Sequence, residues 1–449
     1  MPRQSDQSTI ARTGVAILGH GTVGRGVVRI LGDSDGDLAR RTGLAFDPVA
    51  VAVRDPGRHR DVAAGVPITS DADAAAVHPS AAVVLELMGG VERPRELVLK
   101  ALAAGKHVVT ANKALVAAHG AELVAAARDN GVSIAFEASC GGGIPIVGAL
   151  TNGLLANRCQ ALVGILNGTS NFILTRMTDG GDSYADALAE AQRLGFAEAD
   201  PSLDVNGRDV AQKLAILAGL AFGERIDERS IHVEGIESLD AADIAYAGEL
   251  GYVVKLLAIA QRDDEDGRLT LSVFPGLVAA RSPLADVKGP FNAVTVFGDA
   301  LGQATFVGRG AGQTPTASAV VADLISVVGG GYPAMFRQLR TLPDLARPAD
   351  VIDFEQARHR YYLRLVAQDA PGVLADVTRC LGNAGISLTA VLQHEIPPGD
   401  QGRVPVVVTT HVSREGSVRR AVAQIDALPS ILEPPVVLRI ADLPTEAIG

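Results

Sequence analysis

Cysteine is scarce in this sequence. Its three cysteines, Cys140, Cys159 and Cys380, lie far apart, and none belongs to a CxxC pair. This spacing excludes a disulfide framework and the common zinc-binding patterns. We therefore expect reduced thiols, as is typical of a cytosolic protein.

Excess positive charge and long apolar runs are also lacking. Lys and Arg together number 40 against 51 Asp and Glu, which gives a formal net charge of −11. This balance argues against a nucleic-acid partner, which requires a basic face. No stretch reaches the ~18 apolar residues of a membrane span, and residues 1–10 contain no apolar core of the signal-peptide type. The sequence predicts a cytoplasmic protein that binds neither membranes nor nucleic acid.

Short apolar runs alternate with helical patterns over roughly the first 145 residues. The alternation predicts an α/β fold with a doubly wound, Rossmann-type parallel sheet. The expected strands are residues 15–18, 48–54, 81–87, 107–110 and 132–137.

The pattern changes after this part, which predicts further domains. Residues 146–340 mix long helices with strands, as in an α+β domain. Residues 341–358 are rich in Pro, Asp and Arg and are typical of a linker. Residues 359–443 follow the order βαββαβ of a ferredoxin-like unit, with a turn at 397–403. The predicted domains are 10–145, 146–340 and 359–443.

A glycine-rich loop follows the first expected strand. Gly19, Gly21 and Gly24 form GxGxxG between a strand and a helix, which favours binding of a dinucleotide pyrophosphate. No acid ends the second strand; Arg54 stands there instead and can neutralise a ribose 2′-phosphate. We expect NADP. The next residue, Asp55, is acidic, so NAD stays an alternative cofactor. The alternative for Arg54 is a solvated surface residue with no role in binding.

Acidic residues cluster ahead of a lysine further along the chain. Four carboxylates lie within twelve residues, and Lys213 follows Asp209 by four positions, so both share one helix face if a helix starts near Gly207. Such a lysine can protonate a developing alkoxide, and the acids can hold a substrate ammonium. A solvated acidic loop with a simple salt bridge is the alternative.

Two other segments follow expected strands. Lys113 lies at the carboxyl edge of the predicted sheet, where α/β folds bind ligands, although a solvent-exposed lysine at a helix start gives the same pattern. Glu137 precedes three glycines at 141–143, whose exposed carbonyls can surround a monovalent cation. A flexible hinge is the alternative.

Several of these stretches resemble the homoserine dehydrogenase family, in order along the chain. They are ELMGGV (86–91), VTANKAL (109–115), EASCGGGIPI (137–146), NGTSNFIL (167–174), GFAEADPSLDVNGRDVAQK (195–213) and GRGAGQTPTASA (308–319). The unit that contains DAPGVL (369–374) resembles an ACT regulatory domain. The combination is similar to monofunctional, threonine-regulated bacterial enzymes, which implies that residues 146–340 carry catalysis and dimerisation.

The resemblance implies a role for each matching residue. Lys213, Lys113 and Asp209 would be catalytic, with Lys213 as the expected proton donor, although the sequence does not decide between the two lysines. Glu198, Asp204 and Asp209 would bind the substrate. With the loop and Arg54, the expected cofactor-binding residues are Gly19, His20, Gly21, Thr22, Val23, Gly24, Arg54, Lys113, Gly195 and Gly310. A sodium ion would be held by Glu137, Cys140, Gly142 and Ile144.

The resemblance also implies an activity and its control. The expected reaction is the reversible, NAD(P)-dependent reduction of L-aspartate 4-semialdehyde to L-homoserine, a step toward threonine, methionine and isoleucine. Threonine would inhibit it through the ACT domain, and the chain would form a homodimer or homotetramer. The alternatives are another Rossmann amino-acid dehydrogenase or a non-catalytic sensor of nucleotides and amino acids. An ACT unit that serves dimerisation alone also stays open.

Overall fold

The computed structural model describes residues 12–32, 34–58, 65–263, 266–394 and 402–442. It divides into two compact units that alternate along the chain. Unit 1 comprises residues 1–158, 215–228 and 306–348, and unit 2 comprises residues 159–214, 229–305 and 349–449. The predicted domain limits at 10 and 443, and most of the turn expected at 397–403, lie outside the described residues.

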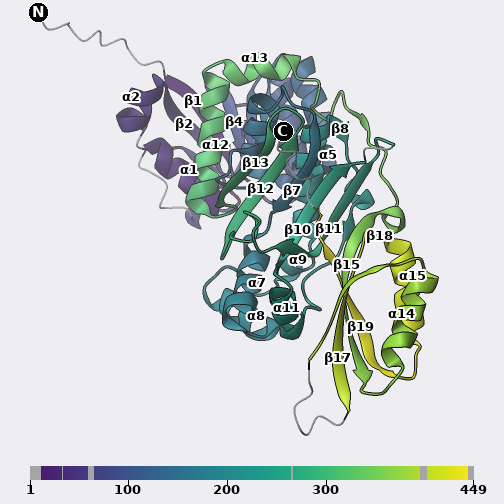
Figure 1. Cartoon of the computed structure of the whole chain (residues 1–449). Coiled ribbons are helices and arrows are strands. Elements are labelled where there is room, and N and C mark those ends of the chain that lie inside the picture. Colours follow the sequence, from purple (N-terminus) through teal and green to yellow (C-terminus); the bar gives the residue numbers. More distant parts are fainter. Residues whose placement is uncertain (1–11, 33, 59–64, 264–265, 395–401, 443–449) are drawn as a thin grey trace, which may run out of the picture. The chain divides into compact units, whose positions relative to one another are not determined.

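Unit 1 is built on a six-stranded parallel sheet with the order β3-β2-β1-β4-β5-β6. Figure 1 labels three of these strands, β1, β2 and β4. This order confirms the predicted Rossmann-type sheet, in which ligands bind at the carboxyl ends of the strands. The strands are β1 (Arg12–Leu18), β2 (Ala45–Ala52), β3 (Ile68–Thr69), β4 (Val83–Glu86), β5 (His107–Thr110) and β6 (Ile134–Ala135).

Helices from both ends of unit 1 cover this sheet. The helix α12 follows a long excursion of the chain through unit 2, yet it packs on α1, where Gly26 permits close approach to Ala317. The longer helices are α1 (Thr22–Gly32), α4 (Glu92–Ala103), α5 (Lys113–Asp129), α12 (Gln313–Val328) and α13 (Gly331–Gln338). The shorter helical segments are Ser34–Leu38, α2 (Ala39–Thr42), Pro56–Arg58, α3 (Ala72–Ala76), Glu137–Ser139, α6 (Ile146–Gly148) and Ala149–Gly153.

The sheet of unit 2 is the larger. Its eleven strands follow the path β13-β12-β7-β10-β11-β19-β15-β17-β16, with β18 and β9 paired off that path. The strands ahead of the C-terminal part are β7 (Cys159–Ile165), β9 (His232–Val233), β10 (Tyr252–Arg262), β11 (Leu269–Ala279), β12 (Phe291–Gly298) and β13 (Gly302–Arg309). The second half of β13 belongs to unit 1, where β8 (Glu224–Arg225) also pairs with β14 (Arg347–Pro348).

Five helices accompany this sheet, and α10 passes from unit 2 into unit 1 after Leu214. They are α7 (Gly168–Gly180), α8 (Tyr184–Arg193), α9 (Ser202–Val205), α10 (Arg208–Phe222) and α11 (Ala241–Glu249). Short helical turns occur at Glu228–Ser230 and Phe354–Gln356.

The C-terminal part of unit 2 has the predicted βαββαβ order. Its strand order, β19-β15-β17-β16, is the ferredoxin-like one, so the prediction is confirmed. Apolar side chains of β15 and β17 pack under α14 and α15 and form a separate core. The elements are β15 (Arg358–Gln368), α14 (Val373–Asn383), β16 (Leu388–Gln393), β17 (Arg403–Thr410), β18 (Ser413–Arg414), α15 (Glu415–Asp426) and β19 (Ile431–Ile440).

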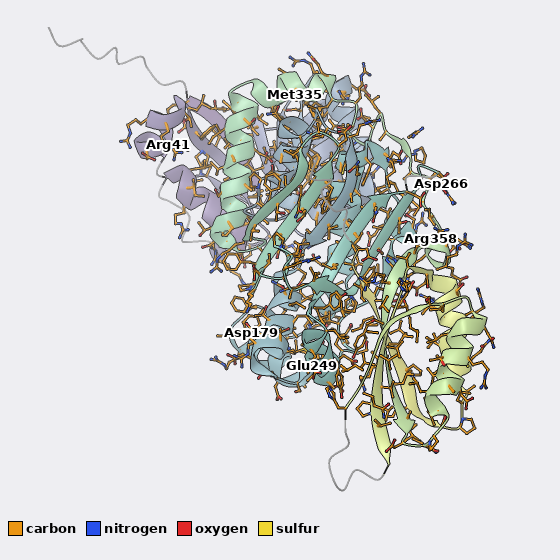
Figure 2. The ribbon with its side chains drawn as sticks, in the orientation of Figure 1. Arg41, Asp179, Glu249, Asp266, Met335 and Arg358 are labelled. Carbon is orange, nitrogen blue, oxygen red and sulfur yellow. The ribbon has the colours of Figure 1, made fainter. Side chains whose placement is uncertain are left out.

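The C-terminal part is joined to the rest of unit 2 through the sheet itself. Strand β19 pairs in parallel with β11, so that Gly276 lies opposite Arg439. Asp266, just before β11, and Arg358, the first residue of β15, lie along one edge of the unit (Figure 2), and both line a cavity of about 240 Å³.

Among the described residues, no single helix has both the length and the apolar character to cross a membrane. Helices α12 and α13 meet the length and apolarity criteria only when they are counted together, and the pair is bent by 81° at the break between them.

Candidate active site

The lysine of the acidic stretch is buried in unit 2. Lys213 and Asp209 lie one turn apart on α10, and Lys213 Nζ contacts Asp209 Oδ2 at 2.7 Å. The ammonium also donates to the Leu166 carbonyl at 2.7 Å, and the Lys213 residue is only 8% exposed. Two fixed acceptors therefore hold the ammonium at the edge of a core rather than in solvent.

Asn167 connects the acids of this site. It is the N-cap of α7, where its Oδ1 accepts from the Ser170 amide at 2.8 Å. Its Nδ2 donates to Asp204 Oδ1 at 2.9 Å and to Asp209 Oδ2 at 3.0 Å. Sequence reasoning assigned no role to this residue. The available signal was a capping residue between a strand and a helix within NGTSNFIL.

The structure brings Lys213, Asp209 and Asp204 together but leaves Glu198 on an exposed loop. In the described part of the chain, the Glu198 carboxylate has no hydrogen bond to this cluster. Gly195, which has a positive φ of 76°, starts the same loop. Thr169 Oγ1 holds that loop to α7 through the Phe196 carbonyl at 2.6 Å.

The glycine loop of unit 1 has the geometry of a phosphate cradle. Gly19 has a φ of 102°, and its amide donates to the Ala52 carbonyl at 2.9 Å. A Cβ at Gly24 would lie 2.4 Å from the Gly19 carbonyl oxygen, whereas a Cβ at Gly21 would meet nothing within 4 Å. Helix α1 begins at Thr22, so the amides of its first turn, which have no partner within the helix, follow the loop directly. The residues fit a dinucleotide, because the open space at Gly21 would let a pyrophosphate approach the backbone.

The remaining cofactor residues lie around this loop. His20 is buried next to it, and Val23 lies in the first turn of α1. Arg54 follows β2 and is exposed, while the neighbouring Asp55 accepts from the Gly57 amide at 3.0 Å and lies 3.3 Å from the Arg58 guanidinium. Arg54 is therefore on the surface just past the carboxyl end of β2.

Lys113 starts α5 at the carboxyl edge of the same sheet. Asn112 caps this helix by accepting from the Leu115 amide at 3.1 Å, and its Nδ2 donates to the Gly90 carbonyl at 2.8 Å. Buried Glu86 accepts from the Thr110 hydroxyl, and burial raises the pKa of Glu86. These contacts fix the backbone at the start of α5.

The segment from Glu137 to Ile144 lies in unit 1 beside Gly310. Gly142 has a φ of 55°, and a Cβ there would lie 2.4 Å from the Gly310 carbonyl oxygen. The Glu137 carboxylate accepts from the amides of Val147 and Gly148 at 2.9 and 2.6 Å. Glu137 therefore has its side chain engaged, and a cation here would rest on backbone oxygens.

Oxygen donors of that kind suit a hard monovalent cation such as sodium. Within the described ranges, no group of three or more His, Cys, Asp or Glu side chains is arranged to hold a metal ion. Cys140 is fully buried, and its predicted contribution is a carbonyl rather than its thiol.

Family models match most of the chain. The model for homoserine dehydrogenase matches residues 145–325, the model for its NAD-binding domain matches 19–137, and the ACT-domain model matches 361–429.

Characterised proteins and solved structures resemble the chain over nearly its whole length. A homoserine dehydrogenase of Pseudomonas aeruginosa is 44% identical over 96% of this chain and 99% of its own. One from Synechocystis is also 44% identical, over 95% and 99%. The crystal structure of a homoserine dehydrogenase from Thiobacillus denitrificans has a TM-score of 0.89 at 44% identity, covering 96% of this chain and 99% of that one. A hyperthermophilic archaeal homoserine dehydrogenase mutant, solved in complex with NADPH, has a TM-score of 0.60 at 28% identity and covers 71% and 98%.

Proposed function

This chain belongs to the homoserine dehydrogenase family, and from that premise we propose that Lys213 and Asp209 form the proton-transferring unit of the reaction. The activity is the NAD(P)-dependent reversible reduction of L-aspartate 4-semialdehyde to L-homoserine. The observation that carries the assignment is the buried ammonium of Lys213, held at 2.7 Å by Asp209 and at 2.7 Å by a carbonyl.

The residues around this ammonium suit the charge that the reaction creates. A bound nicotinamide would supply hydride chemistry at the aldehyde carbon. In the reduction, negative charge develops on the substrate oxygen and Lys213 Nζ donates the proton that neutralises it; in the oxidation of homoserine, Lys213 accepts that proton. Asp209 holds that Nζ in place, and Asn167 holds Asp209. Lys113 stays a proposed catalytic residue that adds positive potential.

Carboxylates of the same stretch suit the amino-acid end of the substrate. Asp204 is half-buried beside Asp209 and can accept from the substrate ammonium. Glu198 is proposed to bind the same group from its exposed loop. Anchoring the ammonium in this way would restrict the orientation of the rest of the substrate.

The preference for NADP is also a proposal, supported by Arg54 at the end of β2 and by the absence of an acid at that position. We propose a sodium ion on the backbone oxygens of Cys140, Gly142 and Ile144, with Glu137. Gly195 and Gly310 stay proposed cofactor contacts.

Regulation and assembly extend the proposal. The ACT domain is consistent with a small-molecule effector, and we propose threonine, whose hydroxyl and ammonium resemble those of homoserine. A homodimer or homotetramer, a cytoplasmic location and the domain limits given above stay predictions of the sequence.

The test is a set of initial rates followed by NADPH absorbance, with homoserine, with NADP or NAD, and with or without threonine. Lys213→Met keeps the volume of the side chain and removes the proton, so turnover should fall by about 10²–10⁴-fold while NADPH still binds. Lys288→Ala, which removes an exposed lysine paired with Asp179, serves as the control and should match the wild type. Unchanged turnover in Lys213→Met would remove Lys213 from this role.

A further inference from the structure

A buried arginine of the ACT part reaches outside that part. Arg439 lies on β19, and its side chain is 4% exposed. It donates to Glu415, the first residue of α15, at 2.9 and 2.6 Å. It also donates to Glu234, which follows β9, at 2.6 and 2.9 Å. Both contacts have the fork geometry that makes arginine–carboxylate pairs directional.

The packing around Arg439 fixes its position. Its guanidinium lies over the rings of Phe274 and Phe354, at 5.1 and 4.9 Å from their centroids. Its backbone is paired with Gly276 of β11, and β19 runs beside β15 in the ACT sheet (Figure 1). The Glu234 side chain is thus tied to β19 through this guanidinium, while its amide donates to the Val273 carbonyl of β11 at 2.8 Å.

The segment that contains Glu234 supports the acidic loop of the active site. The Ile236 amide donates to the Val205 carbonyl at 2.9 Å. A Cβ at Gly235 would lie 2.5 Å from that same carbonyl oxygen, and one at Gly207 would lie 2.9 Å from Val233. Residues 233–236 thus lie directly against residues 205–207, the short stretch between the two site carboxylates Asp204 and Asp209.

We propose that Glu234 and Arg439 are positioning residues that hold the segment 233–236 against 205–207, so that the ACT sheet sets the placement of Asp204 and Asp209. The proposal rests on the roles assigned above to Asp204, which binds the substrate ammonium, and to Asp209, which holds Lys213. It makes homoserine binding, rather than cofactor binding, the quantity that the ACT sheet controls.

The experiment uses the full-length chain with Glu234→Gln, which keeps the shape of the side chain and removes its charge. Initial rates are measured with homoserine and NADP varied separately. The KM for homoserine should rise about tenfold and the KM for NADP should stay within about twofold. Arg439→Lys keeps the charge but loses both forks, and it should shift the homoserine KM in the same direction. If Glu234→Gln folds poorly, the KM values of Arg439→Lys serve as the test instead. In both variants, the fold-inhibition by threonine should shrink.

The matched control is a second buried pair at the same junction. Arg364 of β15 contacts Asp243 of α11 at 2.6 and 2.9 Å, and Asp243 is fully buried. Asp243→Asn should lower stability as Glu234→Gln does, yet leave the homoserine KM near the wild-type value.

Two results would overturn the proposal: a homoserine KM unchanged in both Glu234→Gln and Arg439→Lys, or an equal rise in Asp243→Asn, which would mean general loosening of the junction. The proposed function fails separately. Normal turnover in Lys213→Met would exclude Lys213 as the proton donor. The homoserine KM of Glu234→Gln would still show whether Glu234 positions the segment 233–236.

Discussion

Asn167 combines three contacts at one residue. Its oxygen caps α7, and its amide nitrogen donates to two carboxylates that would otherwise repel each other in a buried place. The three contacts fix the orientation of the amide, because exchanging its oxygen and nitrogen would break all of them. The residue therefore sets the relative placement of Asp204 and Asp209.

Replacing Asn167 by Ser separates the effect of the helix cap from that of the two hydrogen bonds to the carboxylates. Serine is as good an N-cap as asparagine, but its shorter side chain cannot reach both carboxylates. We expect kcat/KM for homoserine to fall about 10–100-fold, and the free energy of unfolding to fall by about 1–3 kcal/mol from the lost hydrogen bonds to charged groups. Initial rates and urea unfolding measure the two effects.

Asn167→Ala is the control for the cap. It loses the cap as well as the donors, so it should be less stable than Asn167→Ser by about 1 kcal/mol but equally impaired in kcat/KM. An activity that followed stability across the two variants would contradict the positioning of the carboxylates by Asn167.

Burial of a lysine does not by itself indicate catalysis in this chain. Lys255 on β10 is 2% exposed, and its Nζ donates to the Val287 carbonyl and to Asn171. Burial lowers the pKa of Lys255 to about 8. Asn171 also binds three carbonyls between Val287 and Phe291, so Lys255 fastens a loop to α7. Lys213 differs because its partner Asp209 shares Asn167 with Asp204, among the acids of the proposed substrate site.

At the scale of elements, the glycine loop shows two kinds of requirement. Gly24 is needed for packing, since a Cβ there would collide with the Gly19 backbone. Gly21 is not needed for packing, because nothing lies within 4 Å of its Cβ position. Without cofactor, the strand–loop–helix unit should therefore tolerate a methyl group at Gly21. The methyl group should interfere only with cofactor binding.

Two alanine variants test this distinction. Gly21→Ala should leave the free energy of unfolding within about 1 kcal/mol of the wild type and raise the KM for NADP by about tenfold or more. Gly24→Ala should lower the free energy of unfolding by about 1–3 kcal/mol through overpacking. Thermal melts without cofactor and NADPH titration measure both. A Gly21→Ala variant with a lowered melting temperature but normal NADPH binding would show that Gly21 serves packing rather than cofactor binding.

Elements with strong local signals could be predicted from the sequence. The strand, GxGxxG and helix at the start of unit 1, and the βαββαβ order of the ACT part, follow from periodicity and turn residues. The strand β3 has only two residues and gave no such signal. The spacing of 30 residues from Gly24 to Arg54 exceeds the ~20 of the standard unit and so indicates an insertion before β2, where the structure has short helical segments.

Contacts between distant residues could not be predicted in this way. Asn167 meets its carboxylates across 37 and 42 residues, and Arg439 meets Glu234 across 205. No periodicity within one element encodes such a pair. The acids and Lys213 were found because they lie within one short stretch. Their spacing and chemistry indicated the roles, and the family resemblance favoured these roles over a solvated acidic loop.

At the scale of the molecule, unit 2 joins its catalytic and ACT parts by one sheet and two buried ion clusters. The sheet contact pairs β11 with β19. The clusters centre on Arg439 and on Arg364, each with a buried carboxylate partner. Because a charge buried beside its partner costs much more when the partner is neutralised, this junction should be sensitive to acid.

The pH dependence follows from Glu234. Burial raises its pKa, but hydrogen bonds from His232 and Arg439 outweigh burial and hold the pKa at about 2, below the ordinary 4.5. A lowered pKa means that the ionised form stabilises the fold fully above pH 4.5 and loses this effect as pH falls toward 2. The wild type should therefore be more stable than Glu234→Gln at pH 6, and this advantage should shrink at pH 4 and further at pH 3. Urea midpoints of both full-length proteins at the three pH values measure it, and an advantage that stayed constant from pH 6 to 3 would show that the Glu234 charge does not hold the junction.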